Sequence, residues 1–126
     1  MGNSVKIKVE KTSNYTVMSN QHFKVRNMSL KAKGMLSLIL SLPPDWDYSI
    51  TGLASICKES YNTISNILKE LENLGYLRIE KTYPKKVSEG GTGRYEYIYT
   101  IYEHSITPER LEFSKKTIPE KQGIVF

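Results

Sequence analysis

The change of hydrophobic period at Gly75 limits what this chain can fold into more than any other feature of its sequence. Upstream, apolar residues recur at helical spacing, namely Ile64, Ile67, Leu68, Leu71 and Leu74. Downstream, Leu77 and Ile79 alternate with charged residues, which is the period of a β-strand. Glycine readily takes the left-handed backbone conformation that ends many helices. The sequence therefore predicts an amphipathic helix, capped by Ser60 and ending near Leu74, that leads directly into a strand.

Two further helices are predicted before this one, and a serine marks the start of each. Ser29 is typical of an N-cap and precedes a helix over residues 30–42, which ends before two prolines. The second half of that helix is apolar nearly all round, so the helix is central or lies at an interface. Ser49 opens a short helix that reaches about residue 57, and a tight turn over residues 58–60 joins it to the third helix.

The other regular patterns indicate extended chain. Tyr95, Tyr97, Tyr99 and Ile101 fall on alternate positions, so they predict the second strand of a hairpin with a long, glycine-rich loop over residues 83–93. A similar alternation near Val5, followed by residues 15–18, predicts a short N-terminal hairpin or extended arm. After residue 103 the patterning decays, apart from one helical turn expected after Pro108.

In this order, the elements predict a mainly α fold with a small β-sheet (α+β), in the form of a winged helix-turn-helix with an N-terminal β arm or hairpin. Residues 1–20 are the predicted arm, residues 21–103 the winged helix-turn-helix domain, and residues 104–126 a C-terminal linker or tail. A short second helix and a tight turn present the outer face of the third helix, which fits a DNA major groove about 12 Å wide.

The length and composition fit one small domain. The chain has 126 residues, of which 39% are hydrophobic and 25% charged. Its single cysteine, Cys57, excludes an internal disulfide framework, and its apolar stretches fall short of the roughly 20 residues of a membrane span. We therefore expect a cytoplasmic protein with no membrane partner. The formal net charge of +5, concentrated in the N-terminal third, favours a polyanionic partner.

The sequence gives little basis for catalysis. His22 and His104 are far apart, Cys57 is at a core-facing position, and the glycines of residues 90–93 belong to a hairpin tip rather than a phosphate-binding loop. One Cys and two isolated His residues do not make a ligand set for a metal. We expect no enzymatic activity, no catalytic residues, no cofactor and no metal.

The predicted outer face of the third helix is polar. At 100° per residue, the positions opposite the apolar stripe are Asn62, Asn66, Lys69 and Asn73. Asn can pair bidentately with adenine, and Lys can reach guanine or a phosphate. The DNA contacts predicted on this helix and its cap are Ser60, Tyr61, Asn62, Thr63, Ser65, Asn66 and Lys69. The alternative is that these side chains only solvate a surface helix.

Basic residues elsewhere are candidates for phosphate contacts. Those of the turn and wing are Lys58, Lys85, Lys86 and Arg94, and those of the first helix are Lys31 and Lys33. The alternative for each of them is that it is only a solvated charge on the surface. The alternating tyrosines of the hairpin can in principle stack on single-stranded bases, but we interpret them as packing against the third helix or a partner subunit.

Four stretches together carry a family resemblance: residues 30–36 (LKAKGML), 43–50 (PPDWDYSI), 52–54 (GLA) and 68–77 (LKELENLGYL). Over roughly residues 15–102 the chain resembles the N-terminal winged-helix domain of replisome-organiser and replication-initiator-like proteins of Gram-positive bacteria, their phages and mobile elements, which are related in fold to the DnaD N-terminal domain. The resemblance implies DNA binding at an origin or operator, and self-association through the first helix and the wing strands. In longer relatives a C-terminal region engages the replication machinery, so we expect a short member or an N-terminal domain.

Three functions stay open on the sequence. The first is sequence-specific binding of double-stranded DNA in replication initiation of a phage or mobile element, and the second is transcriptional regulation with the same chemistry. The third is a protein-interaction or oligomerisation module with weak DNA binding, favoured by the single lysine on the outer face of the third helix. The expected partners are duplex DNA, further copies in a homodimer or higher oligomer, and replication proteins.

Overall fold

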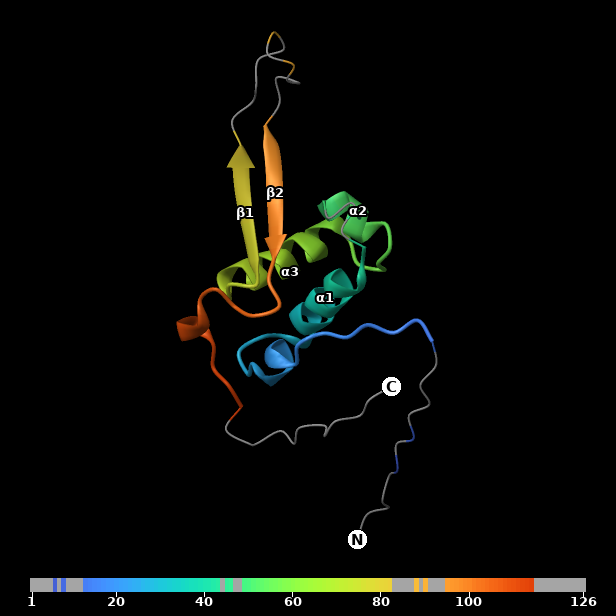
Figure 1. The fold of residues 1–126 in the computed structure, drawn as a ribbon, viewed down its shortest axis with the longest axis vertical. Helices are drawn as coiled ribbons and strands as arrows, with labels where there is room; N and C mark the ends of the chain where they lie inside the picture. The colour runs from blue at the N-terminus through green and yellow to red at the C-terminus, as the bar shows by residue number, and fades with distance from the viewer. Residues whose placement is uncertain are drawn as a thin grey trace.

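Three α-helices and a two-stranded antiparallel sheet make up the described part of the chain, as predicted for an α+β fold. The computed structural model describes residues 6, 8, 13–43, 45, 46, 49–82, 88, 90 and 95–114. In chain order the elements are η1 (Gln21–Lys24), α1 (Leu30–Ser41), α2 (Ile50–Ala54), α3 (Tyr61–Asn73), β1 (Leu77–Thr82), β2 (Glu96–Ile101) and η3 (Pro108–Arg110). In Figure 1 the β1–β2 hairpin stands on α3 and projects away from the helices.

Each α-helix begins after the predicted serine. The hydroxyls of Ser29, Ser49 and Ser60 accept hydrogen bonds from the backbone N–H three residues on, at 3.1, 3.0 and 3.3 Å. The helix α2 ends at Ala54, earlier than predicted. The N–H groups of the two residues that follow Ser55 bond carbonyls only three positions back, so the chain tightens into a turn there.

Gly75 ends α3 in the predicted way. Its φ is +82°, in the left-handed region, and its N–H donates to the carbonyl of Glu72 at 3.1 Å. The next N–H, of Tyr76, donates to the carbonyl of Leu71 at 2.9 Å. This pair of bonds is the Schellman motif, which satisfies carbonyls at the helix end. The chain then turns at once into β1, which places the hairpin against α3.

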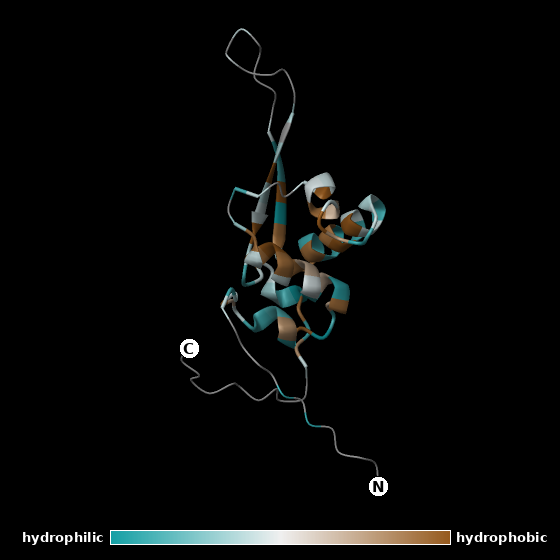
Figure 2. Ribbon diagram, turned by 90° about the vertical axis from the view of Figure 1, so that its right-hand side faces the viewer, coloured by the Kyte–Doolittle hydropathy of each residue, from teal (hydrophilic) through white to brown (hydrophobic). Residues whose placement is uncertain are grey.

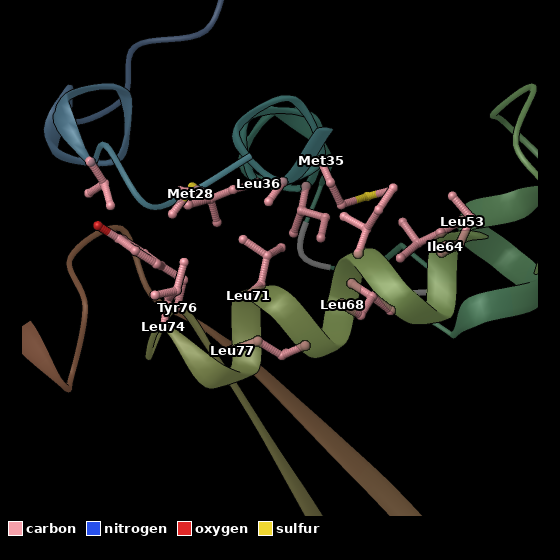
Figure 3. Close-up of a cluster of buried hydrophobic side chains, with 14 of the residues drawn as sticks. Met28, Met35, Leu36, Leu53, Ile64, Leu68, Leu71, Leu74, Tyr76 and Leu77 are labelled. Atoms are coloured by element: carbon pink, nitrogen blue, oxygen red, sulfur yellow. The ribbon is translucent and has the colours of Figure 1, made fainter. Parts of the chain in front are cut away.

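The core lies where α1, α3 and the base of the hairpin meet (Figure 3). Met35 and Leu36 of α1 point toward Leu68 and Leu71 of α3 in that view. In Figure 2 hydrophobic residues are concentrated on the parts of these elements that face one another. In the hairpin, Leu77 pairs with Ile101 and Ile79 with Tyr99, and these four pack on or within the core. The apolar stripe predicted for α3 is buried throughout, with residues Ile64, Ile67, Leu68, Leu71 and Leu74 all at 7% exposure or less.

The segment after β2 belongs to the folded domain, which corrects the prediction of a linker or tail from residue 104. The N–H of Ile106 donates to the carbonyl of Gly75 at 2.9 Å, and Leu111 is buried. Phe113 forms an antiparallel bridge with Val25. The domain therefore extends at least to residue 114. Its C-terminal part was not recognised because it is held by bonds to distant residues and has no regular pattern of its own.

The N-terminal prediction was a short hairpin or an extended arm. Residues 13–20 contain no strand, which does not support the hairpin and leaves the extended arm as the prediction. The other strand of that arm lies largely outside the described residues. What anchors this end is η1, whose His22 is fully buried and shares a 2.9 Å hydrogen bond from Nε2 to Ser37 Oγ. Next to it, Gln21 Oε1 accepts hydrogen bonds from Tyr76 Oη at 2.9 Å and Ser105 N at 3.0 Å.

Candidate nucleic-acid interface

The outward face of α3 is a polar strip of three asparagines and one lysine. Asn62, Asn66, Lys69 and Asn73 are all exposed, on the side of the helix opposite the buried stripe. The helix that carries them is fixed at one end by the Ser60 cap and at the other by the Gly75 motif. The predicted geometry of this face is therefore confirmed. We call these four residues the α3 strip.

At the start of α3, Ser60 acts as the helix cap. Its Oγ accepts from Thr63 N at 3.3 Å and lies 3.1 Å from Thr63 Oγ1, while the residue stays exposed. Tyr61 is 55% exposed and Ser65 is half-buried. The cap therefore engages the Thr63 N–H and the hydroxyls of Ser60 and Thr63 with one another, at the end of a helix where a phosphate can bind.

One flank of the α3 strip is a hollow between α3 and α1. Its volume is about 580 Å³, and it is lined by Ser29, Leu30, Lys31, Thr63, Asn66, Ile67 and Glu70. A neighbouring hollow of about 610 Å³ reaches the turn before α3 and includes Lys58. Lys31 lines both hollows and is exposed, and Lys58 is exposed as well. Two of the predicted phosphate contacts therefore lie on the same side of the molecule as Asn66.

The carboxylate of Glu70 is engaged at the start of α1 rather than on the α3 strip. Its two oxygens accept hydrogen bonds from Ser29 N at 2.6 Å and Ser29 Oγ at 2.7 Å. An acidic group at a helix N-terminus is stabilised by the unpaired N–H groups and the helix dipole. This contact ties α1 to α3 and leaves Lys69 as the charged member of the α3 strip.

The other predicted basic contacts divide into two groups. Lys33 is turned toward η1, because its Nζ donates to the carbonyl of Phe23 at 3.1 Å. The structure therefore does not bring Lys33 together with Lys31, and its role as a phosphate contact stays a prediction. The wing candidates Lys85, Lys86 and Arg94 lie outside the described residues.

The hairpin carries exposed aromatic residues that the sequence interpretation treated as packing. That interpretation holds for Tyr76, which is fully buried. Burial raises the pKa of its phenol to about 12. Packing against the third helix does not hold for Tyr95 and Tyr97, which are 51% and 57% exposed, and their packing against a partner subunit stays a prediction. Tyr99 lies two residues nearer the core and packs against it. Burial raises the pKa of Tyr99, and Tyr61, Tyr97 and Glu72 raise it further.

Two other titratable groups, the thiol of Cys57 and the imidazole of His22, are poorly suited to nucleophilic or acid–base chemistry. Burial raises the pKa of the Cys57 thiol, with a smaller contribution from Glu59, so the thiolate is disfavoured. Burial lowers the pKa of His22, helped by Lys33 and opposed by Glu103, so its imidazole is held neutral inside the core. Within the described residues, His, Cys, Asp and Glu nowhere gather in a group of three that could hold a metal ion.

No model of a known protein family matches this sequence, and no curated protein or solved structure matches the chain. Among the helices of the described residues, none has the length and apolarity required to cross a bilayer.

Proposed function

We propose that this domain is a winged helix-turn-helix that binds double-stranded DNA with the α3 strip in the major groove. The observation that carries the proposal is the strip itself: its residues are exposed in one line on a helix whose opposite side is buried. The short α2 and the turn before α3 match the helix-turn-helix order, and the hairpin follows where a wing belongs.

The chemistry of the strip favours base recognition over simple charge attraction. Asn62 and Asn66 are suited to the N6 and N7 atoms of adenine, and Lys69 to guanine or a phosphate. Tyr61, Thr63 and Ser65 sit beside them on the same helix. Lys31 and Lys58 flank the strip and supply sequence-independent contacts to the backbone.

The biological setting that we propose is replication initiation in a phage or mobile element, with transcriptional regulation as the alternative. The family resemblance supports the first, and both use the same DNA chemistry. In either setting a homodimer would read two half-sites, about one helical turn or a multiple of it apart. The protein-interaction module is favoured by one observation, Leu30, which is 84% exposed at the edge of the α1–α3 hollow.

The test is selection of bound duplexes from a random DNA library, near physiological salt, with wild type and two variants. Asn66→Ala should relax specificity at one position of the enriched motif and cost that position about 1–3 kcal/mol of discrimination. Asn20→Ala, at an exposed asparagine before η1, is the matched control and should enrich the wild-type motif.

A second pair of variants separates phosphate contacts from base contacts. Lys31→Gln and Lys58→Gln should weaken all duplexes alike, and each should reduce the slope of log affinity against log salt by about 1. If wild type enriches no motif, the sequence-specific reading fails. Light scattering at high protein concentration would then test whether the domain is an interaction module. A monomer would contradict that function.

A further inference from the structure

The inner face of the β1–β2 hairpin, meaning the side that packs on α3 at its base, continues beyond the core as a solvent-exposed aromatic surface. In the antiparallel register Lys81 pairs with Tyr97, two positions further from the core than the pair of Ile79 with Tyr99. Side chains alternate between faces along a strand, so Lys81 and Tyr97 share the face of the buried residues. Tyr95, directly before β2, is joined to this face by its contact with Lys81. This face therefore changes from core to open surface between Tyr99 and Tyr97.

The exposed rings of this face are accompanied by a cation. The Nζ of Lys81 lies 3.8 Å from the centroid of the Tyr95 ring. Among the described residues, the hairpin's ion pair joins Arg78 and Glu80 at 2.8 Å, on the opposite face. The inner face thus offers Lys81 as a positive charge beside the Tyr95 ring, while Arg78 and Glu80 on the outer face pair with each other.

Tyr61 is another exposed ring, 55% exposed, at the start of α3. The aromatic surface is defined as Lys81, Tyr95 and Tyr97.

We propose that this aromatic surface binds unpaired nucleotide bases by stacking, so that the protein recognises single-stranded nucleic acid as well as the duplex bound by the α3 strip. Exposed aromatic rings with a neighbouring cation are the combination that holds single strands irrespective of sequence.

The surface favours nucleic acid over a second copy of the chain because of its charge. A stable protein interface at this face would bury Lys81, whereas a phosphate would pair with it.

The experiment is fluorescence anisotropy of the full chain with three labelled probes: an oligothymidylate, a duplex, and the same duplex with an unpaired thymidine tail. Tyr97→Ala should weaken oligothymidylate and tailed-duplex binding by about fivefold or more. It should change binding of the blunt duplex by less than twofold. Tyr97→Phe keeps the ring and should bind every probe within twofold of wild type.

Matched controls come from the same strand and from another exposed tyrosine. Ile98→Ala changes the neighbouring exposed residue on the opposite face, and Tyr15→Ala removes a remote ring that is 63% exposed; both should bind all probes like wild type. Lys81→Gln should lower the salt slope for oligothymidylate by about 0.7, while Tyr97→Ala leaves that slope unchanged. A crosslink from 5-iodouracil in the oligonucleotide should map to Tyr95 or Tyr97.

The outcomes separate this inference, which extends the proposed function, from that function itself. Loss of oligothymidylate binding in Tyr97→Ala supports the stacking surface even if no duplex motif is ever enriched. Equal losses in Tyr97→Ala and Ile98→Ala would overturn it. It is also overturned if Tyr97→Ala keeps its single-strand affinity and instead lowers the oligomer mass, because a second copy then covers this face.

Discussion

Gly75→Ala and Gly34→Ala are the same substitution, and the structure gives them opposite effects on stability. At Gly75 the positive φ costs an alanine about 1–2 kcal/mol. An added Cβ would also lie 2.8 Å from the backbone N of Thr107, which cannot rotate away. The segment 105–107 would have to shift and strain the bond from Ile106 N to Gly75 O, at about 1 kcal/mol. Gly75→Ala should therefore destabilise the fold by about 2–3 kcal/mol.

At Gly34 nothing lies within 4 Å of an added Cβ, and the position is exposed in the middle of α1. Alanine there should stabilise the fold by about 0.5–1 kcal/mol, because glycine loses more backbone entropy in a helix. Urea and thermal unfolding would show Tm falling by roughly 10–25 °C for Gly75→Ala and rising by a few degrees for Gly34→Ala. Gly75→Asn, whose side chain tolerates positive φ, should recover only the backbone share of the loss. A Gly75→Ala protein as stable as wild type would refute the docking of residues 105–107.

Three further predictions concern the contacts that join distant parts of the chain. Glu70→Gln should cost about 1 kcal/mol by weakening the charged cap on Ser29, whereas Glu72→Gln, at an exposed neighbour, should cost little in the same urea titration. Tyr76→Phe should cost about 1 kcal/mol through the lost hydrogen bond to Gln21, with an unchanged near-ultraviolet spectrum apart from the phenol contribution. The pKa of folded His22 lies below the unfolded value of roughly 6.5, so the unfolded chain takes up the proton first. Stability should be constant above that value and fall as the pH drops below it toward the folded pKa. His22→Gln should remove that part of the slope between pH 7.5 and pH 5; an unaltered slope would contradict a neutral buried imidazole.

Local signals in the sequence predicted local structure well. The three serine caps, the polar strip of α3 and the left-handed Gly75 each depend on residues within one helix, where spacing alone decides which side is buried. What the sequence did not reveal depends on residues far apart. The Glu70 cap joins positions 41 apart, and the Gln21 bond to Ser105 joins positions 84 apart. No periodicity encodes such pairs, so residues 104–114 looked like a tail.

The tyrosines of β2 show why a pattern can predict the face of a sheet without stating what covers it. A period of two states which side of the sheet a residue occupies, and Tyr97 and Tyr99 do share one side. It does not state how far along the strand the core extends. Because α3 covers only the base of the hairpin, the same alternation that buries Tyr99 leaves Tyr97 open to solvent. An aromatic stripe longer than the helix beneath it is therefore where we expect a ligand, and the Tyr97→Ala measurement on single strands tests that expectation.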